Sequence, residues 1–353
     1  MLEHPGRPPS LVVRDVPVPV PASTEALVQV MACGFCHHDL LVMAGVLRRG
    51  VKPQVVLGHE ISGVVVEVGS AVTHLRPGDY VVSLLTNACG QCDRCRRGRE
   101  HRCHHGSGIG HSRDGGFAEY VAIAEASLVT ISPDPLLRKS PLTSLVRKEE
   151  RREFPPQNGV FEDFLYGAAL FGCPIGVVLQ AVQQVAQLHA GETVLVTGAG
   201  GGLGVHAVQV AVHLGARVLA VTSSPEKVPH LARLGATEVL EVPPVPLEVS
   251  PNPPLPRGDA RGVDFSELAL ALTEDQGVDV VIDTVGAALF PATWRSLSQY
   301  GRLLLLGEVT GRPVELNLAE VTVKKHVQSI TGKLGVSDRT QAAVLGVRLG
   351  LAS

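Results

Sequence analysis

The sequence predicts an α/β protein with an N-terminal β domain and a C-terminal α/β domain built on a doubly wound parallel sheet. A chain of 353 residues suits two domains of about 150 to 200 residues each. Short apolar runs divided by Pro and Gly fill its first third, as is typical of β structure. After residue 168, apolar strands alternate with helical segments, which indicates a parallel sheet.

Composition excludes several classes of protein. Apolar residues make up 45% and charged residues 18%, which is incompatible with a wholly disordered chain. A net charge of −3 argues against nucleic acid or an anionic membrane as the main partner. The N-terminus lacks the basic start and apolar core of a signal peptide, and we expect a cytoplasmic protein. Two stretches poor in charge, 164–191 and 193–216, contain Pro174 and a glycine run respectively, so no membrane span is expected.

The N-terminal domain is predicted from apolar runs and turn residues. Residues 11–31 alternate apolar runs with prolines and are expected to form edge strands. Residues 55–85 are expected to form two strands joined by a turn at 76–79.

The C-terminal domain is predicted from a helix over 177–191, strands at 193–197 and 217–222, and a helix over 205–214 between those strands. Further strands are expected at 278–286, 302–309 and 326–332. Residues 136–163 and 243–256 are expected to be inserted surface loops, to which we assign no chemistry.

Four of the seven cysteines form a C-x2-C-x2-C-x7-C motif: Cys89, Cys92, Cys95 and Cys103. Four thiolates within fifteen residues can surround one tetrahedral Zn²⁺ and leave no open position, which defines a structural site. Disulfides are disfavoured by the close spacing and the expected cytoplasmic location, and an iron–sulfur cluster remains an alternative.

Cys36, His59 and Cys173 have a chemistry that suits a second zinc site. Two thiolates and one imidazole leave the fourth zinc position open, as in a catalytic site. Taken singly, each has an ordinary structural explanation, and spacing cannot group residues so far apart. Cys33 is expected to belong to the core.

A glycine turn lies between the strand at 193–197 and the helix that follows. Such glycines let the backbone approach a pyrophosphate, and the helix N-terminus supplies N–H groups and the positive end of its dipole. The turn therefore predicts dinucleotide binding by Gly198, Gly200, Gly201, Gly202, Leu203 and Gly204.

With the Gly58-His59-Glu60 box, the four-cysteine lobe and the glycine turn, the chain resembles the zinc-containing medium-chain dehydrogenase/reductase family of the alcohol dehydrogenase type. The resemblance implies a GroES-like β-barrel catalytic domain at 1–174, with the lobe at 89–103, and a Rossmann domain at 175–333. Family members continue into a segment that returns to the catalytic domain. Residues 334–353 are expected to be the start of such a return, truncated at Ser353.

The resemblance also implies roles for individual residues. Cys36, His59 and Cys173 would ligate the catalytic zinc, Asp39 would orient His59, and Glu60 would lie beside the metal. The implied reaction is zinc-assisted hydride transfer between a nicotinamide cofactor and an alcohol, aldehyde or ketone. Two zinc ions per chain, a small-molecule substrate and a homodimer or homotetramer are expected.

Two positions depart from the pattern of alcohol dehydrogenases. His38 stands where these enzymes usually carry Ser or Thr, and it is our candidate to relay the proton. No carboxylate lies near Thr222 to bind a ribose 2′-OH, whereas Thr222, Ser223 and Lys227 suit a 2′-phosphate. We therefore expect NADP(H) to be favoured over NAD(H).

Two alternatives remain open. The glycine turn, the 221–227 stretch and the His37-His38-Asp39-Leu40 segment also resemble NADPH-dependent enoyl-thioester reductases of the same superfamily, such as acryloyl-CoA reductase. The resemblance implies that such enzymes reduce a C=C bond and need no catalytic zinc. The chain could instead be a truncated, non-catalytic protein that binds the cofactor. The complete ligand set favours zinc chemistry.

Overall fold

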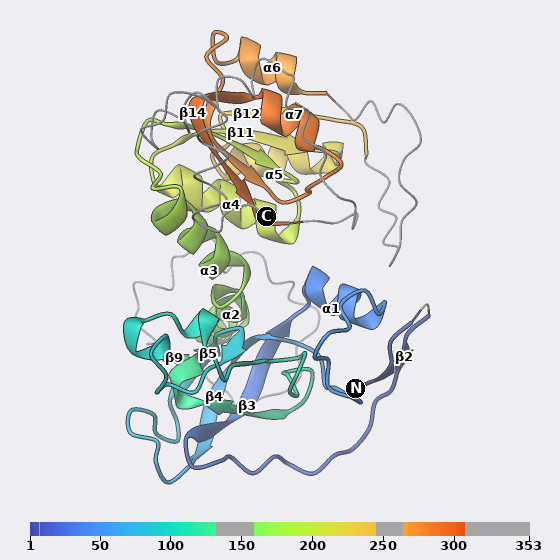
Figure 1. Ribbon diagram of the computed structural model, residues 1–353, viewed down its shortest axis with the longest axis vertical. Helices are drawn as coiled ribbons and strands as arrows, with labels where there is room; N and C mark the ends of the chain where they lie inside the picture. Colours follow the sequence, from blue (N-terminus) through green and yellow to red (C-terminus); the bar gives the residue numbers. More distant parts are fainter. Residues whose placement is uncertain (7, 132–158, 245–263, 308–353) are drawn as a thin grey trace, which may run out of the picture. The chain divides into compact units, whose positions relative to one another are not determined.

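The computed structural model describes residues 1–6, 8–131, 159–244 and 264–307. The chain divides into two compact units, Met1–Val177 and Val178–Ser353. The first unit contains an antiparallel sheet and the second a parallel sheet, which confirms the predicted fold class (Figure 1).

The N-terminal unit is built on five antiparallel strands in the order β8-β3-β4-β5-β9. These strands are β3 (Glu25–Gly34), β4 (Glu60–Val68), β5 (Tyr80–Ser83), β8 (Tyr120–Ala124) and β9 (Leu128–Thr130). Alternate apolar residues pack into one cluster that includes Val28, Ile61, Val81 and Ile123, because successive side chains of a strand point to opposite faces. The predicted turn is present, with the Asp79 carboxylate accepting a hydrogen bond from the Arg76 N–H.

The prediction of strands over residues 11–31 is wrong for its first half. Strands β1 (Leu2–His4) and β2 (Ser10–Leu11) pair with each other, and residues 12–24 form no strand before β3 begins at Glu25. Pro17, Pro19 and Pro21 have no N–H to donate to a ladder, so the apolar alternation between them cannot become a paired strand. Val13 and Val20 are consequently exposed.

Smaller elements of the N-terminal unit carry the functional residues. Helix α1 (His37–Met43) follows β3 directly, and the strand pair β6 (Thr86–Asn87) and β7 (Ser107–Gly108) closes the base of the lobe. Helix α2 (Gly159–Ala168) packs Phe164, Leu165 and Ala168 against Val82. Because α2 begins at Gly159, the end of the predicted inserted loop at 136–163 is helical, and its residues before 159 lie outside the described ranges.

The C-terminal unit contains a parallel sheet in the order β12-β11-β10-β13-β14. Its strands are β10 (Thr193–Thr197), β11 (Arg217–Thr222), β12 (Glu238–Glu241), β13 (Val278–Asp283) and β14 (Leu297–Leu305). In this order the first strand, β10, lies at the centre. The next strands, β11 and β12, are added on one side of β10, and β13 and β14 on the other, as in a Rossmann sheet. The strand predicted at 326–332 and most of the 243–256 segment lie outside the described residues.

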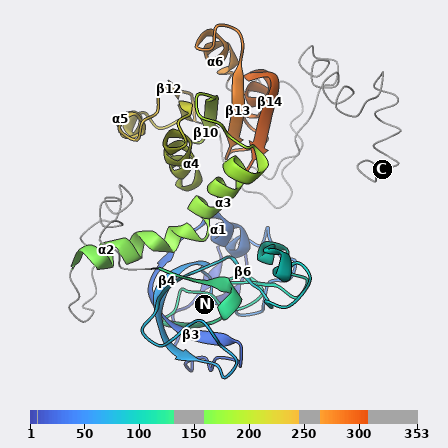
Figure 2. The same cartoon turned by 90° about the vertical axis from the view of Figure 1, so that its left-hand side faces the viewer.

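Helices cover both faces of this sheet (Figures 1 and 2). Val194 and Val196 of β10 pack with α4 (Gly202–His213) and α5 (Val228–Arg233), whereas Leu195 packs with α6 (Ser266–Ala271) and α7 (Phe290–Arg295). This alternation explains the continuous apolar runs of the strands, since both faces are buried. The helix predicted over 177–191 is present in its first part, as α3 (Pro174–Leu179) continued by a π-helical segment, Gln180–Val185. Residues 186–191 are not helical.

No single helix among the described residues is both long and apolar enough to cross a membrane. One bent pair of segments, Phe164–Phe171 and Pro174–Val185, passes by length and composition when the two are taken together.

Candidate metal and cofactor sites

The four cysteines of the lobe converge in the N-terminal unit. The Sγ atoms of Cys92 and Cys95, and those of Cys89 and Cys103, lie 3.5 Å apart, and those of Cys92 and Cys103 lie 3.9 Å apart. Four sulfurs each bonded 2.3 Å from one zinc ion would lie about 3.8 Å apart. The separations exceed a disulfide bond of about 2.05 Å, and so tight a group leaves no room for a cluster of several irons. The donors therefore fit one tetrahedral zinc ion.

Backbone N–H groups donate to the cysteine sulfurs of the lobe and favour the thiolate forms that bind a cation. The N–H groups of Cys95 and His104 lower the pKa of Cys92 to about 6, so this thiol ionises readily. The Cys89 N–H donates to the Cys103 sulfur over 3.4 Å. Of these N–H groups, that of Cys95 belongs to the 3₁₀ turn Cys95–Arg97.

A second group of donors joins residues distant in sequence. One ligand atom each from Cys36, His59, Glu60 and Cys173 lies within 4.8 Å of all the others. Cys36 ends the loop between β3 and α1, His59 and Glu60 lead into β4, and Cys173 immediately precedes α3. Two sulfurs and one imidazole nitrogen suit a zinc ion with one open position, and the Glu60 carboxylate lies beside them.

Gly172 permits this convergence through its lack of a side chain. A Cβ atom at this position would lie 1.9 Å from the Ser83 carbonyl oxygen at the end of β5. The neighbouring Cys173 can therefore reach the donor group only with glycine before it.

Asp39 links two parts of the donor group from within α1. Its fully buried carboxylate accepts hydrogen bonds from the N–H groups of Cys36 at 2.9 Å and Gly58 at 3.3 Å. One of its oxygens also lies 3.6 Å from His59 Nδ1, a separation longer than a normal hydrogen bond. Asp39 thus holds the backbone on both sides of the site and faces the imidazole.

The donors perturb one another's protonation strongly. The Cys173 thiol and His59 lower the pKa of Cys36 to about 4, and the contact with Cys36 raises the pKa of Cys173. Burial, together with the negative Cys36, raises the pKa of Glu60 to about 7. Burial alone would lower the pKa of His59, but Asp39 and Cys36 raise it to about 10. Donors that compete for protons in this way are satisfied together by a divalent cation.

Cys33 stays outside the donor group, as predicted. It packs beside the hydrophobic cluster of the N-terminal sheet, and burial raises the pKa of its thiol to about 12.

His38 lies beside the donor group and contacts a histidine that sequence reasoning missed. Its ring centroid is 5.0 Å from that of His59 and 5.3 Å from that of His111. His111 Nε2 donates to the Arg49 carbonyl over 3.0 Å, since a carbonyl oxygen can only accept. The row His59–His38–His111 depends on the packing of the 108–111 turn beside Gly58, for which the sequence holds no motif.

The glycine turn in the C-terminal unit has the geometry that the sequence predicts. The Ala199 N–H donates to the Val221 carbonyl over 2.9 Å, and α4 begins at Gly202. A Cβ atom at Gly204 would lie 2.1 Å from the Gly198 carbonyl oxygen, so the helix can pack against the turn only with glycine here. The first N–H groups of α4 are thereby presented at the carboxyl ends of the parallel strands, where dinucleotides bind in this fold.

The end of β11 brings the remaining predicted cofactor residues to the same edge. Lys227 Nζ donates to the Gly200 carbonyl over 2.8 Å. Thr222 is buried and its hydroxyl accepts the Ser224 N–H over 3.2 Å, while Ser223 is exposed. A cationic side chain therefore lies at the glycine turn, and the end of this strand carries no carboxylate.

Asp283 is a further residue that the sequence did not single out. Its buried Oδ1 accepts hydrogen bonds from the Thr197 hydroxyl and from the N–H groups of Val285 and Gly286, over 2.7 to 2.9 Å. It ties the end of β13 to the end of β10, from which the glycine turn departs.

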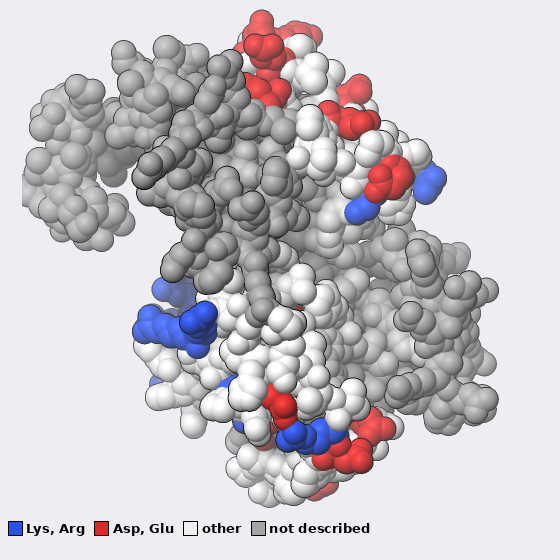
Figure 3. Space-filling model, turned by 90° about the vertical axis from the view of Figure 1, so that its right-hand side faces the viewer, with Lys and Arg blue, Asp and Glu red and all other residues white. Residues whose placement is uncertain are grey.

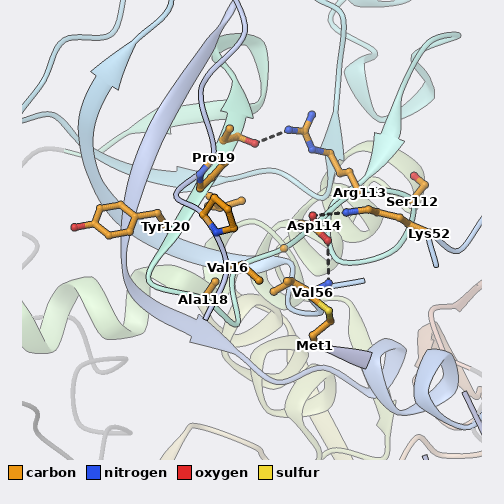
Figure 4. Close-up of a pocket in the computed structure, with 14 residues that line it drawn as sticks. Met1, Val16, Pro19, Lys52, Val56, Ser112, Arg113, Asp114, Ala118 and Tyr120 are labelled. Carbon is orange, nitrogen blue, oxygen red and sulfur yellow. Dashed lines mark hydrogen bonds and ion pairs between the residues drawn. The ribbon is translucent and has the colours of Figure 1, made fainter. Parts of the chain in front are cut away.

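A cavity of about 560 Å³ opens elsewhere in the N-terminal unit (Figure 4). Its lining includes none of the metal donors, and its charged groups are already paired, Lys52 with Asp114 and Arg113 with Glu25. We therefore assign the chemistry to the donor group and not to this cavity.

The comparisons with known proteins agree with this geometry. Residues 22–133 match the alcohol dehydrogenase GroES-like domain, and residues 202–345 match the zinc-binding dehydrogenase domain. The chain is 35% identical over 297 residues to acryloyl-coenzyme A reductase of Metallosphaera sedula, covering 84% of this chain and 73% of that one.

Solved structures are similar over most of the chain. The alcohol dehydrogenase of Aeropyrum pernix has a TM-score of 0.70 at 25% identity, covering 94% of this chain and 88% of its own. A zinc-binding dehydrogenase of Sinorhizobium meliloti 1021, bound to NADP, has a TM-score of 0.65 at 29% identity, covering 89% and 78%.

The chain therefore belongs to the zinc-containing medium-chain dehydrogenase/reductase family of oxidoreductases. With this family come a structural four-cysteine zinc site, a catalytic zinc site and a Rossmann domain that binds NAD(P).

Proposed function

We propose that the protein is an NADPH-dependent reductase of an α,β-unsaturated acyl thioester, with Cys36, His59 and Cys173 holding the catalytic zinc. The observation that carries this substrate class is the 35% identity to acryloyl-coenzyme A reductase over 84% of the chain. When bound, the zinc would act as a Lewis acid toward a carbonyl oxygen, and the dinucleotide would supply hydride.

Three residues beside the zinc ligands have separate roles in this proposal. Asp39 holds the Cys36 and Gly58 backbone and faces His59, which fixes two metal donors in place. His38 lies partly buried beside His59, where it can pass a proton between the site and its surroundings. Glu60 lies among the donors and brings a carboxylate oxygen beside the metal ligands.

The preference for NADPH is proposed from the edge of the C-terminal sheet. Lys227 reaches the Gly200 carbonyl and is positioned to meet the extra negative charge of a 2′-phosphate. The absence of a carboxylate at Thr222 and Ser223 removes the group that would repel this phosphate. The NADP bound by the Sinorhizobium meliloti relative supports the same cofactor.

A second candidate function is the interconversion of an alcohol with an aldehyde or ketone. The complete set of donors, two cysteines and one histidine with Glu60 beside them, favours it. The Lewis-acid chemistry of such a site acts on a simple carbonyl as well as on a thioester carbonyl conjugated to a double bond.

One set of assays distinguishes the two candidate functions. The purified zinc-loaded protein should oxidise NADPH with acryloyl-CoA and form propionyl-CoA, identified by mass spectrometry. NADPH oxidation with propionaldehyde but not with acryloyl-CoA would favour the second candidate. Cys173→Ser is the matched control, because it should abolish either activity while the fold remains intact.

A further inference from the structure

The loop that follows α1 carries an excess of positive charge. Residues 40–58 contain Arg48, Arg49 and Lys52 and no Asp or Glu. Lys52 pairs with Asp114, whereas among the described residues no carboxylate lies within ion-pair distance of Arg48 or Arg49, which are both exposed. These two side chains, the arginine pair, therefore present charge that the described part of the protein does not neutralise.

Hydrogen bonds tie this loop to the histidines beside the metal donors. His111 Nε2 donates to the Arg49 carbonyl over 3.0 Å, and the Lys52 N–H donates to the His111 carbonyl over 2.8 Å. The His111 ring is 5.3 Å from His38, whose ring is 5.0 Å from His59. The rings of His111 and His38 thus lie between the Arg49 backbone and the metal donor His59.

We propose that the arginine pair binds the phosphate groups of a coenzyme A thioester, an inference that rests on the proposed function. A guanidinium group matches two phosphate oxygens at once and keeps its charge at every physiological pH. In such a thioester the reactive acyl group and the phosphates lie at opposite ends of a pantetheine arm. That arm has about the length of four extended residues, roughly 14 Å. The two ring-to-ring steps followed by an extended arginine side chain set an upper limit of comparable length.

The structural lobe carries a second group of exposed arginines, which provides a matched control. Arg96 and Arg97 are exposed and belong to the 3₁₀ turn that includes the zinc donor Cys95. On the face of the N-terminal unit drawn in Figure 3, several Lys and Arg side chains lie together in groups. Removing charge from either pair changes the net charge of the protein equally, so long-range effects cancel in the comparison.

The test compares substrates that differ only in the phosphates. The zinc-loaded enzyme and the double variants R48Q/R49Q and R96Q/R97Q are assayed with acryloyl-CoA and with acryloyl-pantetheine, which lacks the nucleotide. We expect R48Q/R49Q to raise the KM for acryloyl-CoA by roughly 5- to 30-fold, and the KM for acryloyl-pantetheine by less than about twofold. R96Q/R97Q should leave both values near those of the wild type.

A binding measurement separates this inference from the proposed reaction. Propionyl-CoA is titrated calorimetrically into each protein with NADP⁺ saturating, so that the dinucleotide site is filled. Tight binding to the wild type that weakens in R48Q/R49Q supports the arginine pair, even if acryloyl-CoA is not reduced and the proposed function fails. The inference is overturned if propionyl-CoA does not bind, if R48Q/R49Q binds it as the wild type does, or if R96Q/R97Q weakens it equally.

Discussion

Asp39→Asn tests whether one buried carboxylate organises the metal donors. The native side chain accepts two backbone N–H groups, at 2.9 and 3.3 Å, and is fully buried. Asparagine keeps one acceptor oxygen and turns an NH₂ group toward the other donor, so at least one charge-assisted hydrogen bond is lost. Such a bond contributes about 1.5 to 3 kcal/mol, and we expect the free energy of unfolding to fall by roughly 2 kcal/mol.

The same substitution should weaken metal binding. Groups that orient a metal ligand typically contribute a factor of about 10 to 100 in metal affinity, and Asp39 faces His59 while bonding the Cys36 backbone. Urea unfolding measures the stability, and competition with a chromophoric chelator measures the affinity of the more labile zinc.

The control is Asp79→Asn, at a carboxylate that accepts one backbone N–H in the partly exposed turn before β5. This change should cost less than about 1 kcal/mol and leave zinc affinity unaltered, since the asparagine oxygen can still accept that N–H. The reasoning is refuted if Asp39→Asn matches the wild type in both stability and zinc affinity, or if the two variants behave alike.

Four other measurements test separate parts of the structure. Cys95→Ser should lower zinc content and impair folding, whereas Cys173→Ser should keep the lobe zinc and the fold but lose turnover; equal thermal stability of the two would contradict this. Thr222→Asp should shift the ratio of kcat/KM values toward NADH by about tenfold or more, and an unchanged ratio would show that this strand end does not contact the ribose. His38→Ala should lower kcat by about 10- to 1,000-fold with zinc content intact, and wild-type turnover would exclude a proton-transfer role. Burial alone would raise the pKa of Glu125, but hydrogen bonds from the N–H groups of residues 73–75 lower it. The Glu125 carboxylate therefore stabilises the folded protein above the usual pKa near 4.5, and this stabilisation is lost as the pH falls through the lower pKa of the folded state. Glu125→Gln should remove that acid dependence, by less than about 1 kcal/mol, in unfolding curves between pH 3 and 7.

Features encoded by adjacent residues could be predicted from the sequence. Cys89, Cys92, Cys95 and Cys103 lie within one short lobe, so the chain between them can bring four sulfurs together without help from distant strands. The glycine turn likewise needs only a strand before it and a helix after it. The apolar runs of β10, β11 and β13 predicted a sheet buried on both faces, because a continuous run is stable only where both faces are covered.

The alternation of apolar residues predicted a strand incorrectly where prolines interrupt it. The valines between residues 12 and 21 alternate as in a strand, but Pro17, Pro19 and Pro21 cannot complete a ladder. The helical end of the 136–163 segment was missed for a related reason: charge and proline dominate its composition, whereas the helix is stabilised by Phe164 and Leu165 packing on Val82.

The tertiary structure alone decided which distant residues meet. The sequence by itself supplied the donors Cys36, His59 and Cys173, and only a family resemblance grouped them. In the structure they converge because β4 runs antiparallel to β3 and because Gly172 lets the chain approach Ser83. His111, Asp283 and Arg49 carry no motif. His111 bonds the Arg49 carbonyl, and the Asp283 carboxylate bonds the Thr197 hydroxyl, so their places depend on partners far away in sequence. Short-range spacing follows from chain connectivity, whereas contacts between distant segments follow from sheet register and close packing, which no local pattern specifies.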